Sequence, residues 1–193
     1  MMTGVLQIDE GEIYLNGKSI TSDTLEAKKQ FGIVPDNADI FLRLKGIEYL
    51  NFIADIYQID SALRKERIEH YAKMLEMEAA LNDKILSYSH GMRQKIVIMG
   101  VLICEPSIWI LDEPLTGLDP QSAFSLKELM REHARKGNTV FFSTHVLETA
   151  EKLCDKVVII NKGKVLFYGT LDALKAQYQN FDSLESIFLE VVS

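Results

Sequence analysis

The chain has 193 residues, of which 47% are hydrophobic, and its formal net charge at pH 7 is −7. This length and apolar content are enough for one domain with a sizeable core, whereas the acidic balance disfavours a nucleic-acid-binding protein, because such proteins are usually basic. The longest apolar run, residues 96–104, is much shorter than the roughly 20 apolar residues of a membrane-spanning helix, so we expect a chain that does not cross a bilayer.

The first part of the chain, residues 1–41, is expected to belong to an α/β core. Its pattern predicts, in order, a hairpin, a short helix and a strand, at residues 12–15 with 18–20, 24–30, and 31–34. The hairpin prediction depends on Asn16-Gly17, since Asn-Gly favours the type I′ turn, in which both central residues have positive φ. Pro35 is expected to end the strand.

Residues 42–102 are expected to form a helical subdomain inserted into that core. Apolar residues recur at helical spacing in three segments, which are 45–58, 60–75 and 89–104. Asp60-Ser61 and Ser89 are suitable N-caps for the second and third segments, because their side-chain oxygens can accept hydrogen bonds from the first turn of a helix.

From residue 103 to residue 170 the pattern returns to an α/β core. Strands and helices alternate, which predicts parallel strands joined by crossover helices, and in order they are 108–111, 122–136, 139–142, 146–154 and 156–160. Gly163 predicts a hairpin turn into a further strand at 165–168. Residues 171–193 are assigned to C-terminal helices. Thr170 is expected to cap the first, and the last carries an apolar stripe expected to pack on the core, formed by Leu184, Ile187, Phe188 and Val191.

The residues that commonly bind metals or form disulfides do not gather in the sequence. Cys104 and Cys154 both lie in apolar, helical contexts, which favours reduced thiols in a cytosolic protein. The four histidines are scattered, so no metal-binding cluster is expected; they are His70, His90, His133 and His145.

The strand expected at 108–111 ends in two adjacent carboxylates, Asp112 and Glu113. Open α/β sheets bind ligands at the carboxyl ends of their strands. There an Asp can hold Mg²⁺, which prefers oxygen ligands, and the following Glu can orient or deprotonate a water for attack on a phosphoryl group. A buried strand followed by a polar turn would contain the same pair, so the pair alone leaves both interpretations open.

Two longer stretches carry a resemblance to a known family. Residues 108–120 resemble the Walker B motif and D-loop of ABC transporter ATPases, and residues 86–95 resemble the ABC signature, usually written L-S-G-G-Q. The five signature positions read Tyr-Ser-His-Gly-Met, with His90 in place of the first glycine and Met92 in place of the glutamine. This form is similar to that of drug- and antibiotic-type exporters. A capped amphipathic helix is the alternative for the second stretch, and its spacing before the Walker B match favours the signature.

The resemblance implies an α/β fold: a RecA-like P-loop NTPase core with a mostly parallel sheet and an inserted helical subdomain. It also implies ATP and Mg²⁺ as cofactors, with Asp112 holding Mg²⁺, Glu113 acting as the general base and His145 contacting the γ-phosphate. Asp36 occupies the position of the family's Q-loop glutamine, where a carboxylate departs from the pattern. The segment 37–44 that follows would face a membrane subunit.

The signature residues have a different role in the resembled family, where two cassettes pair head to tail. Ser89, His90 and Gly91 would then bind the nucleotide of the partner cassette. This expectation agrees with the physical chemistry of a helix amino terminus, whose free N–H groups and positive dipole end attract phosphate. Asp119 would make contacts across the interface between the cassettes.

The family's Walker A motif, G-x-x-x-x-G-K-[ST], supplies the phosphate cradle. Its nearest match, from Gly11 to Ser19, has five residues between the glycines and an apolar strand within them, so we reject it. Residues 1–6 resemble the end of the helix that follows Walker A. We therefore expect a chain that begins after that loop, binds ATP poorly alone and hydrolyses it negligibly. In the family, the Walker A strand lies beside the strand that precedes the switch histidine. Without it, the resemblance implies an unpaired apolar strand edge at 139–142.

Taken together, the motifs favour the ATP-binding subunit of an ABC exporter, represented by an incomplete chain on the cytoplasmic face of the membrane. Its expected partners are a second cassette and a separate permease, with no nucleic acid. The alternatives are a non-catalytic regulatory partner that lends its signature to another cassette, and a truncated gene product. Chromosome-maintenance ATPases share the signature but insert a long coiled coil, whereas only about 50 residues separate Asp36 from Ser89 here.

Overall fold

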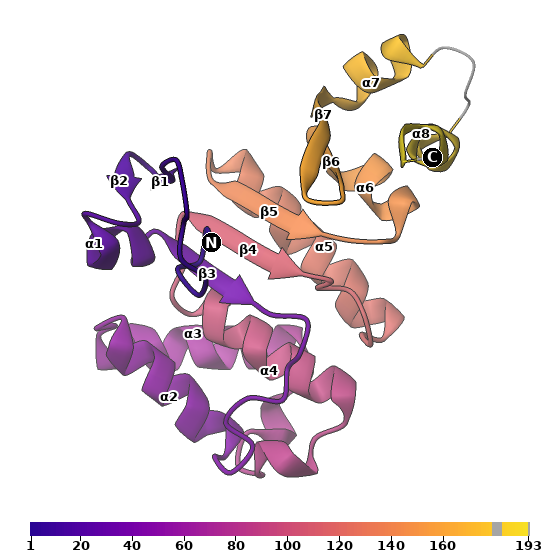
Figure 1. Cartoon of the computed structure of the whole chain (residues 1–193). Helices are drawn as coiled ribbons and strands as arrows, with labels where there is room; N and C mark the ends of the chain where they lie inside the picture. The colour runs from indigo at the N-terminus through magenta and orange to yellow at the C-terminus, as the bar shows by residue number, and fades with distance from the viewer. Residues whose placement is uncertain (179–182, 193) are drawn as a thin grey trace. The chain divides into compact units, whose positions relative to one another are not determined.

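The computed structural model of the chain describes residues 1–178 and 183–192, and Figure 1 shows its helices and strands. The chain divides into two compact units, Met1–Ser143 and Thr144–Ser193. The helical residues 42–102 lie within the first unit. The division into four segments that the sequence suggested stays a prediction. Within the described residues, no helix is both long and apolar enough to cross a membrane.

The first unit is built around a parallel three-stranded sheet with the order β3-β4-β5. The strands are β3 (Phe31–Val34), β4 (Ile108–Asp112) and β5 (Thr139–Ser143). Val34 pairs in register with Leu111, and Asp112 pairs with Ser143. All four apolar residues of β4 are buried, as the sequence predicted for a central parallel strand. The carboxyl ends of all three strands therefore meet at one edge of the sheet.

One face of this sheet is covered by the amino-terminal part of the chain. The hairpin of β1 (Tyr14–Leu15) and β2 (Lys18–Ser19) closes through Asn16-Gly17, whose φ angles of 49° and 74° are those the sequence predicted. Helix α1 (Thr24–Lys28) leads from it into β3. The buried core on this side is formed by Leu15, Phe31, Ile108 and Ile110, with Met2 and Ile20 packed against it.

Helices cover the opposite face of the sheet. Two of them contact it directly, α4 (His90–Leu102) and α5 (Pro120–Arg135). Gly32 lies against Val101 of α4, and its cross-strand neighbour Trp109 stacks on His133 of α5 with ring centroids 4.0 Å apart. Burial lowers the pKa of His133, because it disfavours the charged imidazolium.

The remaining helices of the first unit pack on α4, as the lower part of Figure 1 shows. They are α2 (Gly46–Ile56), α3 (Ser61–Met74) and the short 3₁₀ turns η1 (Glu78–Ala80) and η2 (Ile85–Ser87). Asp60 caps α3 by accepting the backbone N–H of Ala62 at 2.9 Å, as predicted. Arg67 of α3 forms an ion pair with Glu105 and so ties α3 to the chain that follows α4.

The second unit contains, in the residues that the structure describes, an antiparallel hairpin and three helices. The hairpin consists of β6 (Lys156–Asn161) and β7 (Lys164–Thr170), and the helices are α6 (Leu147–Leu153), α7 (Leu171–Gln177) and α8 (Leu184–Val192). Thr170 caps α7 as predicted, accepting the Ala173 N–H at 3.1 Å. The predicted stripe on α8 packs into the core of this unit beside Ile159 and Leu174.

One sequence prediction for this unit is confirmed and another is wrong. β6 and β7 form the hairpin predicted at Gly163, but β6 does not continue the parallel sheet as expected, since among the described residues it pairs with β7 alone. Lys162 and Gly163 both have positive φ, 49° and 77°, and this tight turn brings the chain straight back alongside β6. A two-residue turn can join only antiparallel strands, because a parallel pair needs a long crossover.

Both cysteines are free and half-buried, one in each unit. Burial raises the pKa of the Cys104 thiol to about 12 and that of the Cys154 thiol to about 11. Neither sulfur is therefore a thiolate at neutral pH, and both are free, which fits the prediction of reduced thiols.

The contact between β3 and α4 makes a stability prediction. A Cβ added at Gly32 would lie 2.6 Å from Cγ1 of Val101 and 3.0 Å from Cγ of Pro106. Gly32→Ala should therefore lower the free energy of unfolding by about 1–3 kcal/mol, the usual cost of overpacking. Urea unfolding monitored by circular dichroism measures this. In a Val101→Ala background the same change should cost clearly less, and an equal cost in both backgrounds would rule out the proposed clash.

The edge of the sheet makes a second prediction. Among the described residues β5 pairs only with β4, so it is an edge strand, and Phe141 within it is 46% exposed. Phe141→Lys should reduce concentration-dependent self-association in sedimentation velocity, because a lysine on an edge strand opposes pairing with another chain. Phe124→Lys is the matched control, since Phe124 is 61% exposed but lies on α5. An equal effect of both changes would contradict an edge-specific mechanism.

Candidate functional site

The acidic end of β4 is joined to the end of β5 by side-chain and backbone hydrogen bonds. The Ser143 hydroxyl donates to a carboxylate oxygen of Asp112, and the Glu113 N–H donates to the Ser143 carbonyl oxygen at 3.2 Å. Ser143 was not among the predicted site residues. The sequence contained a signal for it, since Ser143 ends the next strand of the chain, but its use required knowing that the two strands are neighbours.

The two adjacent carboxylates have different backbone conformations. Asp112 is the last residue of the strand and is exposed, whereas Glu113 has a φ of 44°, in the left-handed region that non-glycine residues seldom adopt. The chain turns at once, with the Thr116 N–H donating to the Glu113 carbonyl at 3.1 Å. Such strain is concentrated at functional sites in proteins. The backbone conformation of Glu113 therefore adds to the argument from the sequence that it is a functional-site residue.

Asp119 is held by its own chain. It caps α5, accepting the Ser122 N–H at 2.9 Å and the Ser122 hydroxyl at 2.8 Å, while Pro120 takes the first helical position. Its second partner is the ammonium of Lys95, which lies 2.8 Å from Oδ2. The hydrogen bond from Lys95, followed by those from Ser122, holds the pKa of Asp119 well below its usual range. Asp119 is therefore an ionised, oriented residue.

The start of α4 lies against the turn that precedes Asp119. Ser89 caps α4, as predicted, by accepting the Met92 N–H at 3.3 Å. A Cβ at Gly91 would lie 2.6 Å from the carbonyl oxygen of Gly117, and a Cβ at Gly117 would lie 2.4 Å from the ring of His90. Two glycines are thus needed for this close approach. The structure therefore brings together the predicted residues of the signature and of the D-loop.

The other two predicted residues stand near strand ends. Asp36 is exposed and lies two residues after the end of β3, whose Val34 is aligned with Leu111 of β4. It therefore belongs to the same edge of the sheet as Asp112. His145 is also exposed; it lies two residues after the end of β5, at the start of the second unit.

The chemistry of the donors at the β4–β5 edge suits a hard cation. Among residues 1–178 and 183–192, no group of three or more His, Cys, Asp or Glu side chains forms a metal site. The Asp112 carboxylate and the Ser143 hydroxyl are adjacent oxygen ligands, and Mg²⁺ is commonly bound by one or two protein oxygens together with waters and phosphate oxygens. These residues fit Mg²⁺ bound with a phosphate ligand rather than a cage made of protein alone.

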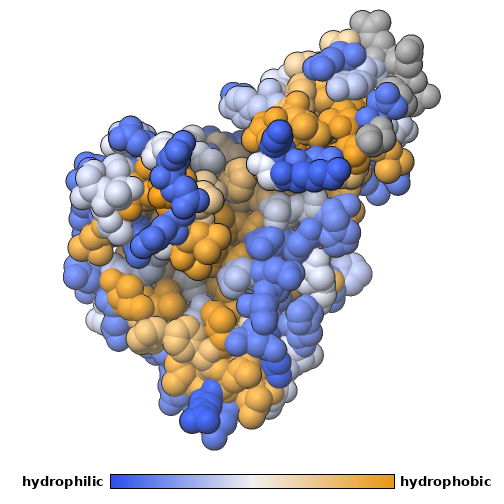
Figure 2. Space-filling model, viewed as in Figure 1, coloured by the Kyte–Doolittle hydropathy of each residue, from blue (hydrophilic) through white to orange (hydrophobic). Residues whose placement is uncertain are grey.

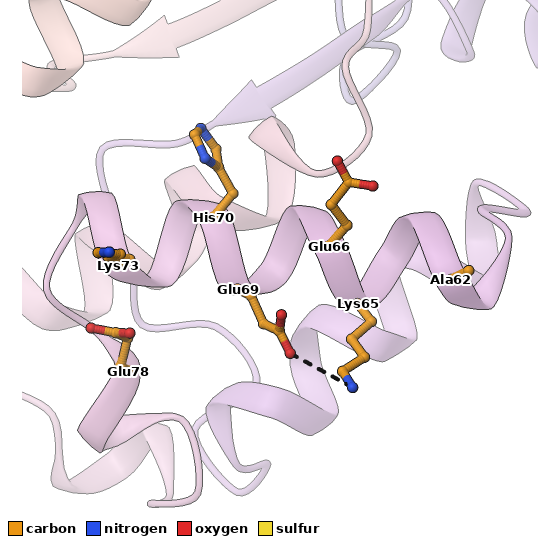
Figure 3. Close-up of a pocket in the computed structure, with 7 residues that line it drawn as sticks. All are labelled: Ala62, Lys65, Glu66, Glu69, His70, Lys73 and Glu78. Atoms are coloured by element: carbon orange, nitrogen blue, oxygen red, sulfur yellow. Dashed lines mark ion pairs between the residues drawn. The ribbon is translucent and has the colours of Figure 1, made fainter.

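A hollow of the surface lies elsewhere, along α3, and Figure 3 shows the residues that line it. Its volume is about 570 Å³. Glu66 and His70 point to one side of the helix, whereas Lys65 and Glu69 point to the other, with 3.9 Å between the charged atoms of that pair. Because these polar groups do not converge on a common point, we do not assign the site to this hollow.

Comparison with known proteins is consistent with this geometry. A family model described as "ABC transporter" matches residues 1–116. The chain is similar to "ABC-type transporter ATP-binding protein EcsA" of Bacillus subtilis (strain 168), with 34% identity over 189 residues, 97% of this chain and 76% of the relative.

Two solved structures are similar in fold. One is the "ATP binding subunit of ABC transporter", with a TM-score of 0.94 and 31% identity, covering 98% of this chain and 80% of the other. The second is cbiO1 from Clostridium perfringens, part of the ABC transporter complex cbiONQ, with a TM-score of 0.73 and 24% identity, covering 93% and 73%.

The ion pair of Asp119 makes a prediction that separates its charge from its role as a cap. Asparagine is as good an N-cap as aspartate, so Asp119→Asn keeps the hydrogen bond to Ser122 but leaves Lys95, which is 8% exposed, without its partner. Chemical unfolding at pH 7 should show a clear destabilisation, because an unpaired buried charge is costly. The matched control is Asp60→Asn in the cap of α3, which should be close to neutral.

The comparison of the unmodified chain with Asp119→Asn also predicts how the stability difference depends on pH. A carboxyl whose pKa is depressed on folding stabilises the native state above its unfolded pKa of about 3.9 and loses that contribution as the pH falls toward its folded pKa. The stability difference between the unmodified chain and Asp119→Asn should therefore be largest at neutral pH and shrink below about pH 4. A difference that stays constant down to the acid transition would contradict the role of the charge.

Proposed function

Because this chain belongs to the ABC transporter family of ATP-binding proteins, an ATPase family, we propose that it couples ATP binding and hydrolysis to export through a separate membrane subunit. The observation that carries the proposal is the end of β4. There Asp112 is paired with Ser143, and Glu113 is held in a left-handed turn beside them. A carboxylate–hydroxyl pair next to a strained carboxylate suits metal-assisted phosphoryl transfer.

Each residue of this edge has a distinct role in the proposed reaction. Asp112, with the Ser143 hydroxyl, would hold Mg²⁺, which supplies charge neutralisation at the phosphates when bound. Glu113 accepts a proton from the attacking water, and His145 contacts the γ-phosphate. Asp36 adds a negative charge at the same edge, and we propose that it acts through a water or the cation.

The start of α4 is proposed to serve a second cassette. Ser89 caps a 13-residue helix that begins with His90 and Gly91. At this end of the helix, N–H groups and the helix dipole favour the phosphates of a nucleotide bound by the partner. Asp119 is proposed to act at the interface between the cassettes. Its hydrogen bonds within the chain support that role by holding its carboxylate in one orientation.

The partner in the membrane is proposed to contact the segment 37–44. Phe41 in this segment is 47% exposed, and its backbone has a positive φ of 50°. Its ring lies 5.4 Å from that of Phe52, which is also exposed. Leu86, 59% exposed, is joined to the segment through its N–H, which donates to the Leu42 carbonyl. Figure 2 shows apolar side chains on the lower part of the molecule, over α2 and this segment. Exposed apolar patches of this kind mark interaction surfaces, which supports a permease at the inner face of a membrane.

Residues 1–193 contain no Walker A sequence, so we propose that a polypeptide of these residues hydrolyses ATP negligibly by itself. A phosphate-release assay should show turnover no greater than that of Glu113→Gln, since that change removes a general base that contributes roughly 10²–10⁴-fold. Turnover by the unmodified polypeptide that Glu113→Gln abolishes would contradict the proposal.

The donation of the signature is tested by mixing. A complete cassette of the family, whose own signature serine is replaced by alanine, should regain ATP turnover when residues 1–193 are added. Ser89→Ala in this chain should lower the recovered rate by roughly 100-fold, the usual effect of losing a donor to transition-state charge. Glu113→Gln in this chain should leave the recovery intact, because the active site lies in the partner. A recovery that needs Glu113 would instead assign the turnover to this chain.

A further inference from the structure

Helix α4 carries two cations in its first two turns that are paired with different neighbours. Arg93 Nη1 lies 2.5 Å from Oδ1 of Asp39, and Lys95 Nζ lies 2.8 Å from Oδ2 of Asp119. Two residues along an α-helix are separated by about 200° around its axis, so these side chains leave opposite sides of the helix. The helix that begins with the signature therefore stands between two anionic partners from distant parts of the sequence.

Arg93 fastens α4 to the segment 37–44. Besides Asp39, its guanidinium donates to the carbonyls of Leu86, at 2.9 Å, and Ile85, at 3.3 Å. Those two residues are themselves joined to the segment, since their N–H groups donate to the carbonyls of Leu42 and Leu44 at 2.9 Å. The Arg93 side chain is 21% exposed. The mostly buried guanidinium of Arg93 thus binds both to Asp39 in the segment and to the two carbonyls just before the signature.

Lys95 fastens the other side of α4 to the loop that follows β4. Its side chain is 10% exposed and ends at Asp119, and one turn earlier Gly91 contacts the carbonyl of Gly117. That loop begins at Glu113, whose carbonyl accepts the Thr116 N–H. A displacement of α4 is therefore carried to the residues next to the acidic end of β4, because neither contact leaves room for sliding.

We propose that Arg93 and Lys95 are positioning residues that link the segment 37–44 to the loop 113–119 through α4. Neither acts on the nucleotide directly. Together they make the segment, the signature turn and the loop move as one body, so that a partner bound to the segment changes the position of Gly91 and Asp119. This inference rests on the proposed function for its consequence in transport, but the mechanical link itself is a property of the first unit.

The mechanical link is tested by amide hydrogen exchange on the chain itself. Lys95→Met should speed exchange at residues 116–123 by about tenfold or more, with β4 unchanged. Arg93→Met should speed exchange at 42–44 and also at 116–123, which a purely local role would not do. The control is Arg67→Met, which breaks another half-buried ion pair of this unit, that with Glu105. If Arg93→Met speeds exchange only near residue 93 and at 42–44, the proposed link is wrong. It is also wrong if Lys95→Met and Arg67→Met change the exchange rates at 116–123 equally.

The functional consequence is tested in the mixture with a complete, signature-deficient cassette. Lys95→Met should lower kcat of the recovered turnover by about tenfold while KM for ATP stays within about twofold, because positioning affects the transition state more than substrate binding. Lys95→Arg should restore the rate, since it keeps the charge. Arg67→Met should have no effect.

The outcomes of the two experiments separate the inference from the proposed function. If the unmodified chain gives no recovery, the proposed donation of the signature fails, while hydrogen exchange still decides the link. If recovery occurs and Lys95→Met supports it as well as Arg67→Met does, the positioning role is wrong. Should Lys95→Met fail to fold, Asp39→Asn, at a carboxylate that is 49% exposed, weakens the other pair and should still speed exchange at 116–123.

Discussion

The parallel pairing of β4 with β5 is the constraint on which the rest of the first unit depends. In a parallel sheet all strands end at the same edge, so a buried apolar strand that ends in a carboxylate places that carboxylate beside the last residue of its neighbour. Here the neighbours are Asp112 and Ser143, joined by a hydrogen bond. The chain must then turn away sharply, and Glu113 adopts the left-handed conformation that makes this turn. The acidic edge is thus a result of the strand order.

A second constraint is the close contact between the start of α4 and the loop after β4. The backbone carbonyl of Gly117 leaves no room for a side chain at Gly91, and the ring of His90 leaves none at Gly117. This approach places a helix amino terminus, which attracts anions, next to a loop that carries carboxylates. There the Lys95 ammonium, whose side chain is 10% exposed, pairs with the Asp119 carboxylate, which is 44% exposed and also accepts hydrogen bonds from Ser122. The signature turn and the D-loop are therefore held together by these two contacts, Gly91 with Gly117 and Lys95 with Asp119.

The two sides of α4 are consistent with the proposal that one helix serves both a nucleotide and a protein partner. Its signature end is exposed, while the next turns carry Arg93 and Lys95 to opposite neighbours. The exposed rings of Phe41, in the segment that Arg93 holds, and of Phe52, on α2, lie 5.4 Å apart. A stiff helix between two ion pairs is a physical basis for coupling, because it transmits a displacement without a change of its own conformation.

The sequence by itself determined the local structure and the residues that are candidates for the site. The Asn16-Gly17 turn, the caps Asp60 and Ser89, and the buried run before Asp112 were all predictable, because each depends on residues within a few positions of one another. The tertiary structure alone decided the partnerships. The hydrogen bond between Ser143 and Asp112 and the ion pair between Lys95 and Asp119 both join residues that local patterns treat separately. Hydrogen bonds and ion pairs depend on distance in space, and the fold alone sets that distance.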